Sequence, residues 1–404
     1  AATGCDVPVE RHDRRVACGV GCSLPGRHIG GRVNGSRCCT DGIDAFGGIS
    51  GMRILYGVQA TGQGHISRAR AMANAFQALD VEVTWLFSGR ARETLFDMEP
   101  FHHYKHRRGL TFATSSGRVS KRQTLRVNNV FKFLSDVRHL SLEPYDCVVT
   151  DFEPIVAWAA RRAGRECVGI GHQYAFGPGT PVAGDTALTR FIMREFAPVS
   201  HPVGLHWHPY ADNVLPPILD LPPIPNTIEG HVLVYLPFED QSHVTRLLQS
   251  VPGRRFIQYG GNRQVSLLGN VVCKPASIST FKHDLASAAG VICNSGFELI
   301  SECMHWQKPV LTKPLSGQME QLSNALALQQ LGRARVVEEL NQQVLLEWLQ
   351  RPACPVPARF PDVARALANW LARGRPQSIN LLSKTLWLQS GGAPTLAPTP
   401  QRAA

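Results

Sequence analysis

Short apolar runs alternate along this chain with segments in which apolar residues recur at every third or fourth position. Residues 52–58 (MRILYGV) have the length and composition of a buried strand, and Ile66, Met72 and Phe76 then fall on one face of a helix. The same alternation predicts further strands over residues 81–87, 146–150, 166–170, 231–236, 254–259, 270–273, 291–293, 309–315 and 334–337. Strands that alternate with helices are typical of α/β proteins with parallel sheets.

Helices are predicted after Pro154, from Phe297 and Gly317 onward, and over residues 241–250, 279–289, 341–349 and 362–371. A chain of 404 residues suits two domains, and the Pro-rich stretch 215–225 is the predicted linker. We therefore expect one domain over residues 52–215 and a second over 216–372. Residues 373–404 are rich in Pro, Ser, Thr and Gly and predict a flexible tail.

Residues 1–51 have no apolar periodicity and are rich in Gly, Arg and Cys. We expect a disordered extension, or a segment that does not belong to the natural product, and a zinc knuckle around Cys18 and Cys22 is a weaker alternative because its spacing is poor. The cysteines after residue 52 lie in apolar context without metal-ligand spacing, so they predict buried thiols and neither a metal site nor a cofactor.

Two turns in residues 291–332 lie where a predicted strand passes into a helix. Free backbone N–H groups and the helix dipole favour a phosphate at such a point. Ser295 and Gly296 would let a diphosphate approach closely, and Glu298, one turn inside, is placed to accept hydrogen bonds from ribose hydroxyls. Alternatively, Ser295 is only an N-cap, Gly296 only a turn, and Glu298 only a first-turn carboxylate that suits the dipole.

This segment as a whole resembles the donor-binding segment of GT-B glycosyltransferases, especially the murein N-acetylglucosaminyltransferase group. The matching elements are Ser295-Gly296, Glu298 or Glu302, Lys308-Pro309, and Gln321 to Ala325. The resemblance implies an α/β GT-B fold, in which two Rossmann-like domains, for acceptor and donor, face a cleft. The chain departs from the murein enzyme at residues 237–240, where Pro-Phe-Glu-Asp stands in place of a Gly-rich loop.

The resemblance also implies an activity. A sugar would pass with inversion from a nucleoside diphosphate-sugar, UDP-linked by preference, to a glycan, a lipid-linked or a small-molecule acceptor. No Asp-x-Asp pair of the kind that holds a metal ion on the diphosphate occurs in the sequence, so the transfer is expected to be metal-independent. The residues expected to bind the donor are Gly62, Gly64, Ser295, Gly296, Glu298, Gln318, Gln321 and Asn324. A nucleotide-sugar 2-epimerase of the same fold, or a non-catalytic nucleotide-sugar or glycan-binding protein, are the alternatives.

The loop after the first strand carries the candidate catalytic histidine. In the resembled family a Gly-x-Gly-His element at this point faces the cleft, and His65 follows Gly62-Gln63-Gly64. His65 is either the general base or a helix cap that touches phosphate. Asp151, just past a predicted strand, either orients His65, is itself the base, or caps a helix. Glu153 and His172 lie at the same edge and are expected on the acceptor side.

Residues 102–132 contain eight Lys or Arg residues and no acidic residue. They form either a solvated loop or a patch for an anionic acceptor or anionic lipid head groups, with Arg107 and Arg108 as candidate contacts. Aromatic residues are not interleaved with the basic ones, so nucleic acid is not expected. No run is long and apolar enough to span a membrane and no secretory leader is recognisable, which favours a cytoplasmic protein, with the inner face of the cell membrane as an alternative.

Overall fold

The computed structural model describes residues 51–391, apart from residues 112–113, 116–117, 120–123, 125, 262–263, 276 and 353–357. The predicted extension at residues 1–51 lies outside the described residues except for Gly51, as do Lys121 and Arg122 of the basic segment.

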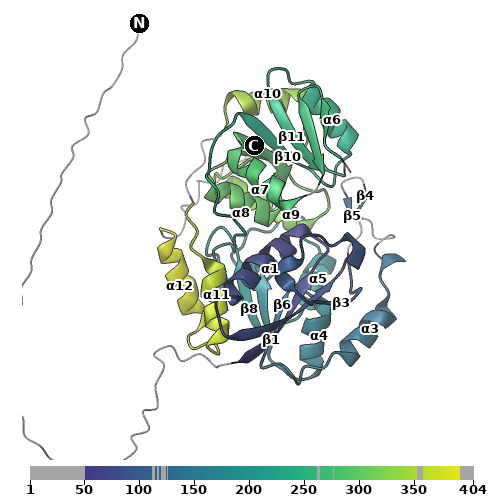
Figure 1. Ribbon diagram of the computed structural model, residues 1–404, viewed down its shortest axis with the longest axis vertical. Helices are drawn as coiled ribbons and strands as arrows, with labels where there is room; N and C mark the ends of the chain where they lie inside the picture. The colour runs from purple at the N-terminus through teal and green to yellow at the C-terminus, as the bar shows by residue number, and fades with distance from the viewer. Residues whose placement is uncertain are drawn as a thin grey trace, which may run out of the picture. The chain divides into compact units, whose positions relative to one another are not determined.

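The first half is built on a seven-stranded sheet in the order β3-β2-β1-β6-β7-β8-β9, with every pair of neighbours parallel (Figure 1). Its strands are β1 (Met52–Gln59), β2 (Val81–Ser88), β3 (Lys105–His106), β6 (Cys147–Asp151), β7 (Val168–Gly171), β8 (His201–Leu205) and β9 (Val214–Leu215). β1 is central and is buried along almost its whole length, which agrees with its uninterrupted apolar sequence. A separate two-stranded ribbon pairs β4 (Thr114–Ser115) with β5 (Arg118–Val119).

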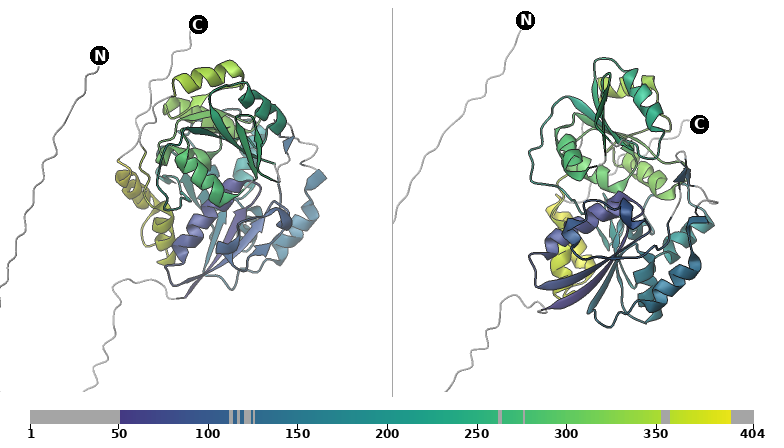
Figure 2. Two further views of the ribbon diagram at one scale, coloured as in Figure 1. Left: turned by 45° about the horizontal axis from the view of Figure 1, so that its top comes forward. Right: turned by 45° about the vertical axis from the view of Figure 1, so that its right-hand side comes forward.

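The second half repeats this design with the strand order β12-β13-β11-β10-β14-β15-β16. Its strands are β10 (His231–Tyr235), β11 (Arg255–Gly260), β12 (Ser266–Leu268), β13 (Val271–Pro275), β14 (Gly290–Asn294), β15 (Val310–Lys313) and β16 (Arg335–Val336). All neighbours are parallel except β12 and β13, which are antiparallel. The predicted parallel α/β organisation is therefore confirmed, and Figure 2 shows helices on both sides of the two sheets.

The helices of the first half are α1 (Gln63–Phe76), α3 (Val130–His139), α4 (Pro154–Arg162) and α5 (Ala187–Glu195). Those that follow β10 in sequence are α6 (Gln241–Gln249), α7 (Ile278–Ser287), α8 (Phe297–His305), α9 (Met319–Gln330), α10 (Gln342–Gln350), α11 (Val363–Ala372) and α12 (Ile379–Gln389). The described residues also form the short 3-10 turns η1 (Arg92–Thr94), η2 (Glu99–Phe101) and η3 (His172–Ala175).

The prediction of a flexible tail from residue 373 is wrong for α12. Ser383 Oγ and Trp387 Nε1 both donate hydrogen bonds to the carbonyl oxygen of Val214, at 2.7 Å each, so this helix packs on β9 of the first sheet. The preceding helix α11 packs on α1, although the sequence assigned it to the second half. Both helices bury apolar side chains there, which holds them against the first half.

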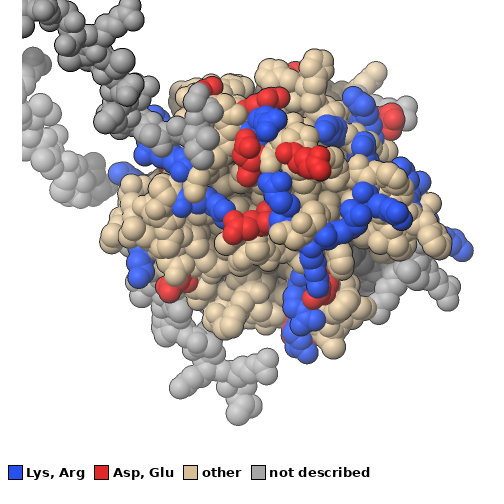
Figure 3. Space-filling model, turned by 90° about the horizontal axis from the view of Figure 1, so that it is seen from below, with Lys and Arg blue, Asp and Glu red and all other residues tan. Residues whose placement is uncertain are grey.

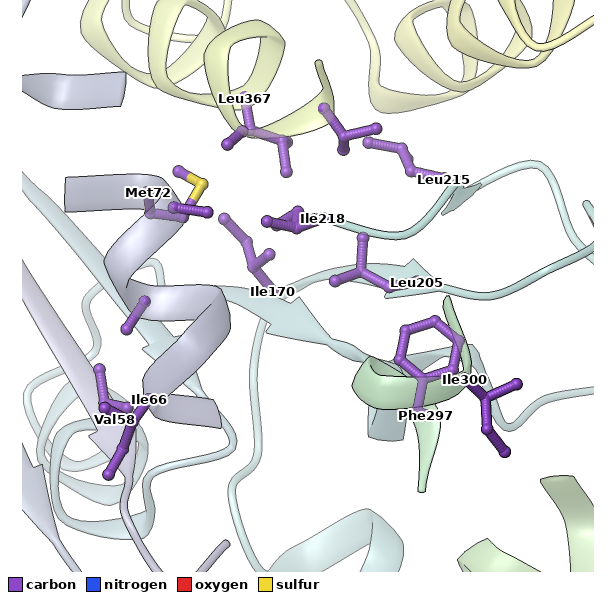
Figure 4. Packing of buried hydrophobic residues seen from close by; sticks show 14 of the residues in the cluster. Val58, Ile66, Met72, Ile170, Leu205, Leu215, Ile218, Phe297, Ile300 and Leu367 are labelled. Carbon is purple, nitrogen blue, oxygen red and sulfur yellow. The ribbon is translucent and has the colours of Figure 1, made fainter. Parts of the chain in front are cut away.

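One buried apolar cluster connects the two sheets. Figure 4 shows Met72 of α1 beside Leu367 of α11, with Leu205 of β8 and Phe297 of α8 in the same cluster. Because Phe297 opens the helix that follows β14, this packing fixes the start of α8 against the first sheet.

Candidate functional site

The carboxyl ends of β1 and β6 lie side by side because the two strands are parallel neighbours, with Val58 opposite Asp151. The loop after β1 leads into α1, whose third residue is His65. Parallel pairing therefore brings a histidine and an aspartate 86 residues apart in sequence into contact: His65 Nδ1 lies 2.8 Å from Asp151 Oδ1. The sequence prediction that Asp151 lies beside His65 agrees with this geometry.

Arg68, one turn after His65 on α1, is the third member of this group. Its Nε donates to Asp151 Oδ2 at 2.8 Å and its Nη2 to Asp151 Oδ1 at 2.5 Å. The Arg68 and Asp151 side chains are 1% and 0% exposed. Burial opposes ionisation of Asp151, but the charge of Arg68 and the contact with His65 outweigh it, so the pKa of Asp151 lies below its ordinary value.

These contacts indicate which of His65 and Asp151, the His65–Asp151 dyad, can accept a proton. An Asp151 carboxylate with a lowered pKa, both of whose oxygens accept hydrogen bonds from an arginine, is a poor proton acceptor. An ionised carboxylate can only accept, so the contact with Asp151 assigns the proton to Nδ1 of His65, although Arg68 Nη2 also lies 3.0 Å from this nitrogen, and Nε2 then keeps its lone pair. The His65 side chain is 15% exposed, so the imidazole is reachable from outside.

The donor-side carboxylate Glu298 comes to the same place from the second half. Arg68 Nη1 forms an ion pair with Glu298 Oε1, and the other oxygen, Oε2, packs over Gly64. A Cβ at position 64 would lie 2.3 Å from Oε2, so the missing side chain of Gly64 is what lets the carboxylate approach. One continuous polar group, which we call the His65 group, is thus formed by Glu298, Arg68, Asp151 and His65.

Three helices begin around this group without a side-chain cap. Their N-cap residues are Gly62 for α1, Gly296 for α8 and Gln318 for α9, and none of them caps its helix with a side-chain hydrogen bond. By contrast, Asn129, Glu153, Thr186, Asp240, Asn341, Asp362 and Ser378 each cap their helix with a side-chain oxygen. Uncapped first turns keep backbone N–H groups available for an anion such as a diphosphate.

Three other predicted donor-side residues are enclosed and bonded to protein groups. Ser295 Oγ lies 2.9 Å from Thr312 Oγ1, and Gln321 Oε1 accepts from the backbone N–H of Leu315 at 2.8 Å. Asn324 Nδ2 donates to the carbonyl of Ser295 at 3.0 Å, while its Oδ1 lies 2.7 Å from His172 Nε2. In this structure these side chains fix the turn before α8 relative to α9.

His172 is fully enclosed and stacks on Phe297, with ring centroids 4.0 Å apart. Burial lowers the pKa of His172, and its Nδ1 lies 2.8 Å from the carbonyl oxygen of Leu205. Its expected role on the acceptor side stays a prediction, and in this structure both of its ring nitrogens are bonded within the protein.

Glu153, the other carboxylate expected on the acceptor side, is also engaged within the protein. It is 0% exposed and caps α4, with its two oxygens accepting from the backbone N–H groups of Ile155 and Val156 at 2.9 and 2.7 Å. Ser88 Oγ donates to it at 2.6 Å. Burial raises the pKa of Glu153 to about 7, although these donors act in the opposite direction. Pro154 occupies the first helical position, which makes Glu153 the N-cap residue of α4. The sequence did contain this signal.

Arg107 and Arg108 lie away from the His65 group. Together with Lys132, Asp136 and His139 they line a hollow between the β3 region and α3, with a volume of about 530 Å³. The formal charge of +11 is not a uniform field: on the face seen in Figure 3, lysine and arginine side chains are interspersed with carboxylates.

Sequence reasoning missed Arg68. The signal that could have found it is a charged residue on the face of α1 that also carries Ile66, Ala69 and Met72, because a buried charge requires a partner. Glu302, the alternative to Glu298 in the motif, is buried and ion-paired with Lys282, and burial raises its pKa.

Within the described residues, no group of three or more His, Cys, Asp or Glu side chains is arranged to hold a metal ion. In the same part of the chain, no helix has both the length and the apolar content needed to cross a membrane.

The comparisons with known proteins agree with the fold. A family model described as glycosyl transferase family 1 matches residues 52–352. The glycosyltransferase SsfS6 of Streptomyces sp. SF2575, complexed with thymidine diphosphate, is 14% identical with a TM-score of 0.50, over 85% of this chain and 97% of that one. The glycosyltransferase of kitacinnamycin is 15% identical with a TM-score of 0.50, over 85% and 100%. MurG of Acinetobacter baumannii is 13% identical with a TM-score of 0.44, over 84% and 99%. A comparison with curated proteins gave no match.

Proposed function

Because this chain belongs to glycosyl transferase family 1 and is a glycosyltransferase of the GT-B fold, we propose that it transfers a sugar from a nucleoside diphosphate donor to a hydroxyl group, with His65 as the general base. The observation that carries this proposal is the contact of His65 Nδ1 with Asp151 Oδ1 at 2.8 Å, which keeps Nε2 available for a proton.

In the proposed step, Nε2 of His65 takes the proton of the acceptor hydroxyl as its oxygen attacks the anomeric carbon. The new carbon–oxygen bond forms on the face opposite to the bond that breaks, so the configuration inverts and the electron pair leaves with the diphosphate. Asp151 holds the imidazole in the required tautomer and stabilises its positive charge after proton transfer. Arg68 in turn fixes Asp151 through two hydrogen bonds.

The leaving diphosphate would be stabilised by the uncapped first turns of α8 and α9, at Gly296 and Gln318. Backbone N–H groups fixed by the fold need no rearrangement when charge develops on the leaving oxygen. In this proposal, backbone N–H groups rather than a divalent metal ion stabilise the charge on the leaving diphosphate, in line with the missing Asp-x-Asp pair.

We propose that Glu298 binds the donor ribose. One of its oxygens is engaged by Arg68, and Oε2, over Gly64, is the oxygen that would accept from ribose hydroxyls. A UDP-linked donor is our proposal; the thymidine diphosphate named for SsfS6 shares the same diphosphate and has only one of the two ribose hydroxyls. Ser295, Gln321 and Asn324 would act by fixing the loop that faces the diphosphate.

For the acceptor we propose a glycan, lipid-linked or small-molecule hydroxyl compound, and not nucleic acid. If the acceptor is anionic, Arg107 and Arg108 are its proposed contacts, since they line an open hollow with Lys132. A cytoplasmic location remains our proposal.

The test is an assay of nucleotide release from UDP-sugars and TDP-sugars in the presence of acceptor panels, followed by NMR of the anomeric configuration. His65→Ala should lower turnover by about 10²–10⁴ while nucleotide binding persists. Loss of nucleotide affinity with unchanged turnover at saturation would instead make His65 a phosphate contact. Interconversion of free UDP-sugars without an acceptor would favour a 2-epimerase.

A further inference from the structure

The outer face of α3 exposes a row of apolar side chains. Val130, Phe131 and Leu134 are 57%, 87% and 54% exposed, and Val127, just before the helix, is 36% exposed. Positions 130, 131 and 134 share one face of the helix, while Phe133 and Val137 of the adjacent face are buried against the first half. A phenylalanine with most of its surface in water, inside a contiguous apolar row, is uncommon on a protein that stays in solution. We call Val127, Val130, Phe131 and Leu134 the α3 stripe.

Basic side chains border the α3 stripe. Arg138 lies one turn after Leu134 on the same face, Arg126 lies directly before Val127, and both are exposed. Arg107, Arg108 and Lys132 line the hollow on the next side of α3. Asp136 is the one carboxylate in the sequence between residues 101 and 142, and it is buried and paired with Lys132 at 2.9 Å.

Charge and apolarity therefore lie together on one side of this helix. A helix that presents such a face can lie in the plane of a lipid interface, with its apolar residues at the acyl boundary and its cations at the head groups. Long arginine side chains can extend from the apolar layer to the phosphates, which accommodates Arg138 at the end of the α3 stripe.

We propose that the α3 stripe and its basic border form a docking surface for a membrane that contains anionic lipids. Charge complementarity selects this occupant. A second copy of the chain would bring the same exposed cations, Arg126, Arg138 and Arg108, against each other, and none of them has a carboxylate partner among the described residues. An anionic lipid surface compensates all of them at once. The proposal is independent of the donor chemistry, because α3 contains none of the residues of the His65 group.

The matched control is α5 of the same half. Leu188 and Phe191 are each 55% exposed, so its apolar exposure is similar to that of the α3 stripe. Its arginines, however, lie beside carboxylates: Arg190 pairs with Asp185, and Arg194 with Glu195 at 2.8 Å. Apolar exposure is therefore present on α5 beside ion-paired arginines, whereas in the described part of the chain Arg126 and Arg138 of the α3 border have no ion-pair partner and only Lys132 and Arg107 of it pair with Asp136.

The experiment is co-sedimentation of the full chain, without donor, with vesicles of phosphatidylcholine alone or of phosphatidylcholine mixed with phosphatidylglycerol. We expect binding to the anionic vesicles only, and weaker binding when salt rises from about 0.1 M to about 1 M, where the Debye length shrinks from about 10 Å to about 3 Å. Phe131→Ser with Leu134→Ser should lower vesicle affinity by about tenfold or more. Arg126→Gln with Arg138→Gln should lower it by about 25-fold, or roughly fivefold per charge.

Leu188→Ser with Phe191→Ser should bind vesicles as the parent does, and unchanged melting temperatures should show that all variants fold. Equal vesicle binding by the parent and the α3 variants overturns the proposal, as does binding to neutral vesicles that is insensitive to salt. A parent that sediments as a dimer without binding vesicles, beside a monomeric α3 variant, would make the α3 stripe a contact between copies. If the Phe131→Ser, Leu134→Ser variant fails to fold, vesicle binding by the Arg126→Gln, Arg138→Gln variant alone tests the proposal.

Discussion

Replacing Asp151 by asparagine tests the central contact of the site. The change removes the negative charge that compensates Arg68, whose side chain is 1% exposed, and leaves Glu298 as its one remaining ion-pair partner in the described structure. It also replaces one carboxylate oxygen by an amide NH₂ group. This group then faces another hydrogen-bond donor, an N–H group of either Arg68 or His65. Removing one partner of a buried ion pair typically costs about 3–5 kcal/mol.

For a fold of roughly 340 residues, an unfolding entropy of about 2 cal/mol/K per residue converts this loss into a fall of about 4–7 °C in melting temperature. Turnover should fall by about 10²-fold or more, because the imidazole loses the group that sets its tautomer. Differential scanning calorimetry and initial rates at saturating donor measure the two effects separately.

The control is Asp146→Asn, near the start of the same strand. Asp146 pairs with Arg53 at 3.7 Å, but both side chains are about half exposed, so its loss should cost no more than about 1 kcal/mol. If Asp151→Asn behaves like this control in both melting temperature and turnover, then Asp151 neither compensates Arg68 nor orients His65, and the proposed dyad fails.

Three further substitutions probe other parts of the structure. Gly64→Ala should weaken nucleotide binding by about tenfold in isothermal titration, with stability changed by no more than about 1 kcal/mol, because the new Cβ would displace Glu298 Oε2; an unchanged dissociation constant would contradict this. Glu153 keeps its proton up to a pKa of about 7 in the fold, so its stabilising effect is complete below the unfolded-state value near pH 4.5 and is lost as pH rises through 7. Relative to Glu153→Gln, urea unfolding should therefore show the parent losing about 3 kcal/mol between pH 4.5 and 7, whereas parallel profiles would refute it. Trp387→Ala should cost about 3–5 kcal/mol because it removes a buried ring and its hydrogen bond to Val214, whereas Leu388→Ala, at a 76% exposed position, should stay within about 0.5 kcal/mol in the same assay.

The central strands of both sheets, such as β1, β10 and β14, could be predicted because they are buried and read as apolar runs, whereas the short edge strands β3, β9 and β12 were not predicted. β8 was missed for the opposite reason, since its five residues include Pro202 and Gly204, which disguise it as a turn. The helix α5 buries none of its residues and so leaves no buried apolar face to recognise. α12 was hidden by composition, because the Pro-, Ser- and Thr-rich residues around it dominate the last stretch of the chain.

In the site, contact between His65 and Asp151 was one of the alternatives that the sequence offered, because a turn after one parallel strand lies beside the end of its neighbour, and their catalytic roles stay a prediction. Arg68 could not be assigned, since its partners Asp151 and Glu298 lie 83 and 230 residues away. The enclosed positions of Glu153 and His172 depend on packing by Ser88 and Phe297, which no local pattern encodes.

The return of α11 and α12 to the first sheet also affects how the protein is made. A ribosome completes β1 to β9 long before it reaches residue 363, so the first half emerges with the surfaces of α1 and β9 that these helices cover still in water. The second half, whose strands and the helices α6 to α10 are contiguous in sequence, needs no later segment for its own sheet. We therefore expect the order of maturation during synthesis to run against the order of translation: the half that is synthesised first is the last to become fully folded, and it stays dependent on chaperones until the final helices leave the exit tunnel.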